Sequence, residues 1–162
     1  MAYNDSAYPN RNAGPRDYRG QPPKGPRNNP APLPPEVKPL PLPENYVDVA
    51  ETVIRTHAEE RSRITTSKIR NLYSLLADIY NVENLRDAPK LLPESVTALT
   101  MLRIRAVYEA GRESSVRTFL DKSKLLAYLK DIGADRQKLL DFTHYMEALV
   151  AYHRLYIGGR EG

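Results

Sequence analysis

The stretch LRIRAVYEAGRE, from Leu102 to Glu113, combines arginines and a tyrosine with apolar residues at helical spacing. At about 100° per residue, Arg105, Tyr108 and Arg112 fall on one face of a helix, roughly opposite its apolar stripe. Arginine binds phosphate through paired hydrogen bonds, and tyrosine stacks on a base or bonds a sugar. This column therefore suits a nucleic-acid backbone. Spacing alone slightly favours an ordinary solvated face, with Tyr108 half covered by arginine stems.

Arg103 differs from these arginines because it projects within the apolar stripe of the same helix. An unpaired charge is costly to bury. We therefore expect Arg103 to be a buried structural charge with a carboxylate or carbonyl partner. The residues of this helix that we expect to face the core are Val96, Leu99, Leu102, Ala106, Val107 and Ala110.

Basic residues continue beyond this helix. From Arg103 to Lys138 the chain has nine Lys or Arg against five Asp or Glu, which makes this segment locally basic. Lys68 and Arg70 form a separate small group, and if the groups meet in the fold they make a phosphate track without sequence preference. The candidate RNA-contacting residues are Lys68, Arg70, Arg105, Tyr108, Arg112, Arg117, Lys122 and Lys124.

Catalytic and cofactor-binding motifs are not recognisable in the sequence. It has no cysteine, no HExxH, no glycine-rich phosphate loop and no GxSxG. His144 and Glu147 could place two metal ligands on one helix face, but nothing points to a third. His153 lies on an apolar stripe, where a hydrogen-bonded core or interface histidine is the default reading. We therefore expect no enzyme activity, no metal and no cofactor, and we expect ordinary surface charge pairing at Asp131/Asp135 and Glu109/Glu113.

Helices must position these residues, because a period of 3.6 dominates from residue 43 onward and no strand alternation occurs. The chain has 162 residues, 41% hydrophobic and 27% charged, as expected for one soluble domain. We predict an all-α fold, a compact bundle of five or six helices. Thr65 or Thr66 should cap one helix and Gly133 should end another. The helical segments are 43–60, 64–81, 93–111, 114–133 (one helix or two short ones) and 135–159.

The last helical segment has the most regular apolar stripe. Tyr145, Tyr152 and Tyr156 lie beside this stripe and could rim the core or form a packing edge for another chain. The expected core residues are Leu139, Phe142, Met146, Leu149, Val150 and His153.

Residues 1–43 contain twelve of the fourteen prolines and carry a net charge of +3, against +1 for residues 44–162. This segment cannot bury enough apolar area to offset chain entropy, so we predict a disordered Pro/Arg-rich tail. It could act as a tether or as an arm along a neighbouring chain. We expect a helical domain over residues 44–157 and a flexible C-terminus over residues 158–162. The start is polar and lacks an apolar signal core, so we expect a cytoplasmic protein without a membrane span.

Four segments together resemble one known family. ITTSKIRNLYSLL, LRIRAVYEAGRE, VRTFLDKSKLLAYLKDIG and DFTHYMEALVAYHR, in this order, are similar to the small subunit of type III-A CRISPR–Cas effector (Csm) complexes. The resemblance covers roughly residues 44–157 and does not extend to the proline-rich tail. It implies a non-catalytic helical bundle that stacks in several copies as an inner filament of an antiviral ribonucleoprotein, beside the backbone and large subunits.

The same resemblance implies that guide RNA and target RNA are the ligands. Base pairing would supply sequence specificity, and this subunit would contact only the backbone of the RNA. Two other readings stay open. One is a helical adaptor between proteins with no direct nucleic-acid contact. The other is an RNA-cleaving enzyme that uses His144 or His153, for which no partner group is apparent.

Overall fold

The computed structural model describes residues 32–160, and the predicted all-α fold is confirmed for this part of the chain. Most of the predicted disordered tail, residues 1–31, lies outside the described residues. Six α-helices are followed by one 3-10 turn. They are α1 (Tyr46–Ala58), α2 (Thr66–Glu83), α3 (Pro93–Arg112), α4 (Ser114–Ser123), α5 (Leu125–Ile132), α6 (Arg136–Tyr156) and the turn Gly158–Arg160.

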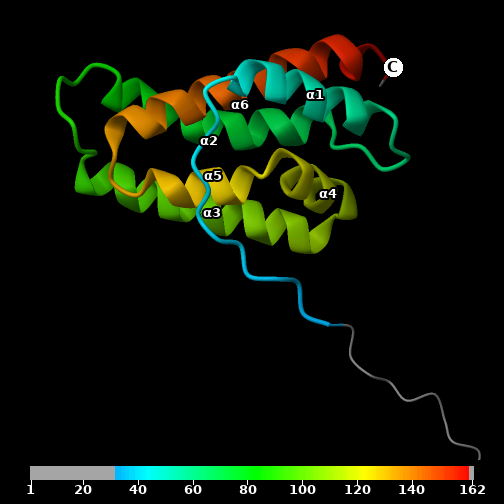
Figure 1. The fold of residues 1–162 in the computed structure, drawn as a ribbon, viewed down its shortest axis with the longest axis horizontal. Helices are drawn as coiled ribbons and strands as arrows, with labels where there is room; N and C mark the ends of the chain where they lie inside the picture. The colour runs from blue at the N-terminus through cyan, green and yellow to red at the C-terminus, as the bar shows by residue number, and fades with distance from the viewer. Residues whose placement is uncertain (1–31, 161–162) are drawn as a thin grey trace, which may run out of the picture. The chain divides into compact units, whose positions relative to one another are not determined.

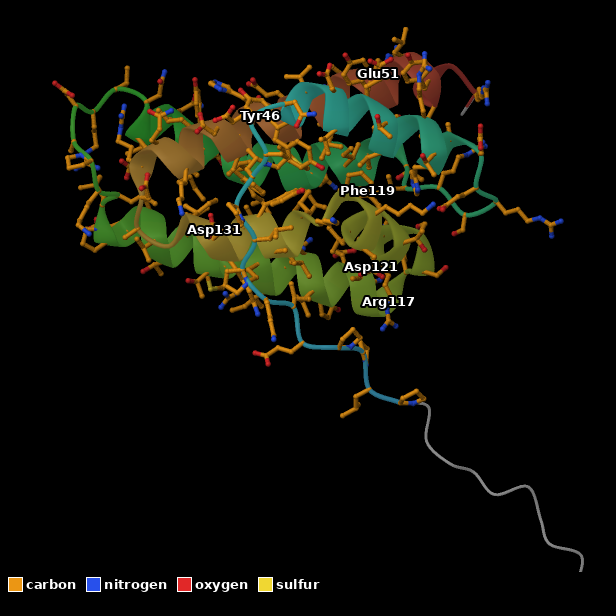
Figure 2. All side chains as sticks on the ribbon, in the orientation of Figure 1. Tyr46, Glu51, Arg117, Phe119, Asp121 and Asp131 are labelled. Carbon is orange, nitrogen blue, oxygen red and sulfur yellow. The ribbon has the colours of Figure 1, made fainter. Side chains whose placement is uncertain are left out.

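The helices of the compact unit form two layers, with α1, α2 and α6 in one and α3, α4 and α5 in the other (Figure 1). The longest helix, α6, packs against α1, α2 and α5, so its apolar stripe forms the centre of the core. Phe119 of α4 points between the layers (Figure 2) and is fully buried. No helix within residues 32–160 combines the length and the apolar character needed to cross a bilayer.

Local sequence signals explain where several helices begin and end. The Thr65 side chain accepts a hydrogen bond from the Lys68 N–H at the start of α2, and Asp135 does the same for Lys138 at the start of α6. Pro93 occupies the first turn of α3, where a missing N–H costs nothing. Gly133 ends α5 with a φ of 54°, as predicted.

Residues 114–133 form two helices because the backbone breaks at Lys124, which has a φ of 51°. The break frees the carbonyl of Ser123, and the Tyr145 hydroxyl donates a hydrogen bond to it at 2.8 Å. Tyr145 is therefore fully buried, and its predicted place on a tyrosine edge is wrong. Tyr152 and Tyr156 do lie at the surface, half-buried, with nearly parallel rings 6.1 Å apart.

The segment just before α1 contacts α5. The N–H of Leu40 donates to the Ala127 carbonyl at 3.1 Å, and Lys130 Nζ donates to the Val37 carbonyl at 2.6 Å. The compact unit that contains this segment begins at Pro35. An extended proline-rich segment forms no internal hydrogen bonds, so its N–H and carbonyl groups are free to bond to a neighbouring helix. Composition alone does not reveal this pairing.

Two buried histidines hold the backbone of Ile64 between α1 and α2. The Ile64 N–H donates to His57 Nε2 at 2.9 Å, so the proton of the neutral imidazole is on Nδ1 and faces Glu60 at 3.1 Å. His153 of α6 lies 2.8 Å from the Ile64 carbonyl through Nε2 and donates to it. His153 is thus a core histidine, as the default reading of its position predicted.

Glu83, at the end of α2, is fully buried and joins three segments. Its carboxylate accepts hydrogen bonds from Arg86 at 2.5 Å and from the Leu92 N–H at 2.9 Å. Arg136 of α6 donates to the Glu83 carbonyl at 2.7 Å. Burial raises the pKa of the carboxyl, but hydrogen bonds from Ser95, Leu92 and Arg86 outweigh burial, so the pKa lies below its usual value.

We predict that the free energy of unfolding falls as the pH drops below about 6.5. Burial lowers the pKa of His57 despite the opposing effect of Glu60, so the unfolded chain takes up this proton more readily than the folded one. The contribution of neutral His57 to the free energy of unfolding is complete above the unfolded-state pKa of this group. It is lost as the pH falls through the folded-state pKa, by at most about 1.4 kcal/mol per pH unit. Urea unfolding at pH 7.5, 6.5 and 5.5 measures this. The His57→Gln variant, which cannot titrate there, should vary less; an equal slope in both proteins would contradict the assignment.

We also predict that Glu83→Gln destabilises the fold by about 3 kcal/mol. The amide group would set N–H donors against the Arg86 guanidinium and remove a buried charge that Arg86 and Leu92 are arranged to bind. The midpoint of urea unfolding measures the loss. Glu59→Gln, at an exposed position, is the control and should change stability by less than about 0.5 kcal/mol. Equal midpoints for the two variants would show that Glu83 has no such role.

Candidate nucleic-acid interface

An open cleft of about 420 Å³ lies between α2 and α3. Its lining includes three of the predicted RNA contacts, Lys68 from α2 and Arg105 and Arg112 from α3. We call these three side chains the cation cluster. Asn71 and Ser74 add polar groups to the α2 side. The fold therefore brings the two basic groups of the sequence together, which spacing along the chain could not show.

The helices account for the position of each cation. Lys68 lies in the first turn of α2, which the Thr65 cap fixes. Arg105 and Arg112 lie seven residues apart on α3, so they share a face and are separated by about 10 Å along the helix axis. Because Lys68 at the start of α2 meets the end of α3, the two helices run antiparallel beside the cleft.

Glu109 lies at the centre of the cation cluster and is mostly shielded, with 16% of its side chain exposed. Its carboxylate is 3.4 Å from Lys68 Nζ, 3.3 Å from Arg105 Nε and 4.0 Å from Arg112 Nη1. Glu113 forms a second ion pair with Lys68, and this hydrogen bond raises the pKa of Lys68. Three cations and two carboxylates leave a net charge of +1, so the cleft attracts anions only moderately.

The sequence predicts ordinary surface charge pairing at Glu109 and Glu113. The helical spacing of Glu109 to Arg105 and Arg112 is a local signal for pairing within α3. The ion pairs to Lys68 join two helices and depend on the fold, so no local pattern reveals them. Beside apolar side chains, the lining of the cleft offers three cations, the Glu109 carboxylate, the Asn71 amide and the Ser74 hydroxyl, a set of groups that can bind an anion.

Tyr108 lies beside the cation cluster with 58% of its surface exposed. The Arg112 guanidinium carbon is 5.5 Å from the centroid of its ring. This cation–π contact covers part of one face of the ring and orders both side chains. The ring is thus accessible at the border of the cluster, as the helical wheel predicted.

The other predicted RNA contacts do not line the cleft. Arg70 and Lys124 are exposed, and Arg117 points away from the bundle on the outer side of α4 (Figure 2). Lys122 forms an ion pair with Glu60 and is half-buried, so it helps to hold α4 against the α1–α2 loop.

Arg103 is not the buried charge that the helical wheel predicted. It is half-buried at grooves between α3 and α5, and it takes part in none of the ion pairs within residues 32–160. Val107, expected in the core, is 53% exposed. Both deviations have one cause: the buried face of α3, centred on Leu102 and Ala106, is turned away from this side of the helix.

The remaining histidine contacts are structural. His144 Nε2 lies 3.4 Å from the Tyr80 hydroxyl, and the two rings pack edge to face. Glu147, the other half of the possible metal pair, instead accepts a hydrogen bond from Tyr73 at 2.8 Å. The two side chains of this pair are thus held by different tyrosines of α2. The His144 ring and the buried His153 ring both lie outside the lining of the cleft.

Comparison with known proteins adds independent information. The family described as Csm2 Type III-A matches residues 42–159, a span that contains all six helices. The chain is 40% identical over 121 residues to the CRISPR system Cms protein Csm2 of Streptococcus thermophilus, covering 73% of this chain and 95% of that protein. It is 39% identical over 113 residues to the Mycobacterium tuberculosis protein of the same name, covering 68% and 90%. The Enterococcus italicus protein is 36% identical over 95 residues, covering 57% and 68%.

Proposed function

The chain belongs to the Csm2 family, the small subunit of type III-A CRISPR–Cas (Csm) complexes, and on this premise we propose that its α2–α3 cleft holds RNA backbone in the assembled complex. In this proposal the subunit is non-catalytic and stacks with further copies beside the guide RNA and target RNA. The observation that carries the RNA contact is the meeting of Lys68, Arg105 and Arg112 in one cleft.

The geometry of the cation cluster supports backbone contact without sequence specificity. Guanidinium and ammonium groups bind phosphate, and phosphates are the same for every sequence. Tyr108 at the border of the cluster is the proposed contact to a sugar or base. In an RNA-guided complex the base pairs read the sequence, so a subunit that holds only the backbone is sufficient.

A net charge of +1 in the cleft supports modest affinity for each copy. RNA phosphates must compete with Glu109 and Glu113 for the same cations. Several copies along one RNA would add their weak contacts, because contacts to one strand act at high effective concentration. Proposed contacts at Arg70, Arg117 and Lys124 would extend the backbone track beyond the cleft.

The alternative is a helical adaptor that does not touch RNA. The observation that favours it is that Lys68, Arg105, Arg112 and Lys122 already have carboxylate partners within the chain. Purification of the chain from cells distinguishes the two functions, because an adaptor would contain no RNase-sensitive absorbance at 260 nm.

We predict that Arg105→Ala with Arg112→Ala weakens binding of single-stranded RNA of arbitrary sequence. Loss of two phosphate contacts should reduce the slope of log K against log salt by about 1.4. Fluorescence anisotropy across a salt series measures both quantities, and Lys68→Ala should act in the same direction. The control is Arg61→Ala with Arg154→Ala, which removes the same charge at exposed positions outside the cleft. Equal losses in both double variants, or no loss in a correctly assembled complex, would refute a contact at this cleft.

We predict that Glu109→Gln strengthens RNA binding, by about threefold at low salt. Removing the central carboxylate raises the net charge of the cleft to +2 and frees three cations from a competitor. The same anisotropy assay measures it. Glu94→Gln removes an exposed carboxylate at the start of α3 and should change affinity less. Weaker RNA binding by a folded Glu109→Gln protein would contradict the prediction.

A further inference from the structure

The outward face of α3 is apolar in the middle of the helix. Met101, Ile104 and Val107 are 58%, 54% and 53% exposed, and we call these three residues the α3 ridge. At about 100° per residue, Ile104 points almost directly away from the side of α3 that carries Leu102 and Ala106. A surface helix normally has polar residues on the side opposite its core-facing stripe, whereas α3 has apolar residues on both sides.

Grooves lie on both sides of the α3 ridge. On the α2 side a groove of about 590 Å³ is lined by Leu75, Met101 and Ile104 among others. On the α5 side a groove of about 370 Å³ is lined by Ile104, Val107 and Leu126 among others. Ridge and grooves form one continuous apolar surface. Such surfaces on soluble proteins mark sites where another molecule binds.

Cations border the α3 ridge on both sides. Arg103 and Lys130 line the α5-side groove, and Arg105 lines the α2-side groove. Asp78 is the only carboxylate in the lining of either groove. The complementary surface therefore needs apolar side chains at its centre and carboxylates at its edges.

We propose that the α3 ridge binds a different protein subunit of the Csm complex, through a single helix that carries apolar residues flanked by Asp or Glu. The length of the ridge fits one crossing helix. Met101 to Val107 spans about 9 Å along the axis, which is close to the diameter of a helix, and Thr97 and Thr100 end the apolar surface on the N-terminal side.

Other occupants fit this surface less well. RNA phosphates need donors at the centre of the contact, where this surface presents aliphatic groups. The same face of a second copy would bring Arg103, Arg105 and Lys130 against one another, and that repulsion opposes pairing. A different face of a second copy is also a poor match for the ridge. The exposed apolar pair Val82 and Leu85, within residues 32–160, offers only two side chains, fewer than the ridge and its grooves can contact.

Assembly of the complex tests the proposal. Ile104→Asp should reduce incorporation of this subunit into the reconstituted Csm complex by about tenfold, because a carboxylate would meet an apolar, acidic-edged partner. Ile104→Val should retain incorporation. Val82→Asp changes a similarly exposed aliphatic residue outside the ridge and serves as the control. Thermal unfolding of each purified protein verifies that all three fold. Equal incorporation of all variants, or equal losses at Ile104 and Val82, would overturn the proposal.

Photo-crosslinking identifies the occupant. A photoreactive phenylalanine analogue at Val107 in the assembled complex should crosslink to a helix of a different protein subunit with Asp or Glu within a turn of the crosslinked residue. A crosslink to RNA, to another copy of this chain, or to no protein would overturn it.

The proposal rests on membership of the complex and not on RNA binding. Loss of RNA affinity in Lys68→Ala, which lies off the ridge, together with normal incorporation would separate the two surfaces, and either proposal can fail without the other.

Discussion

The arrangement of α2 and α3 depends on one buried carboxylate. Glu83 binds the first backbone N–H of the α3 start at Leu92 and the Arg86 side chain in the connecting loop, and its own carbonyl binds Arg136 of α6. These bonds fix where α3 begins relative to the end of α2. Because the helices run antiparallel from that point, the first turn of α2 lies beside the last turns of α3. Lys68 thereby reaches Glu109 and Glu113, and the cation cluster forms about one helix length away from the carboxylate that determines it.

The charges of the cleft balance two requirements. Three cations in close proximity repel one another, and Glu109 offsets that repulsion in the free protein. The same carboxylate weakens any bound phosphate. A single-copy RNA-binding protein would gain from losing it, whereas a subunit that acts in several copies along one RNA needs only a weak contact from each. Glu109 is thus consistent with a proposed role in which affinity comes from the assembly.

Local signals in the sequence were sufficient for most of the fold. The Thr65 cap, the stop at Gly133 and the stripe of α6 each involve residues within a few positions of one another, so spacing reveals them. The burial of Tyr145 depends on the break at Lys124, and the burial of Glu83 depends on three segments distant in sequence. Contacts of this kind arise only when the helices pack.

Dependence on helix packing also explains the results for α3. Its helical wheel correctly predicted that Arg105 and Arg112 are exposed, and it failed at Arg103 and Val107. Arg105 and Arg112 lie on the side of α3 opposite the stripe that the wheel assigned to the core, and the structure leaves both exposed. Val107 and Ile104 are as apolar as the residues that are buried, so composition gives no means of choosing between them. Only the packing of α3 against α2, α4 and α5 shows which apolar side faces inward. An ambiguous wheel is the expected pattern for a helix that packs on its own core at one side and on another protein at the other. The apolar side of α3 that stays exposed therefore fits the contact with another subunit that we propose.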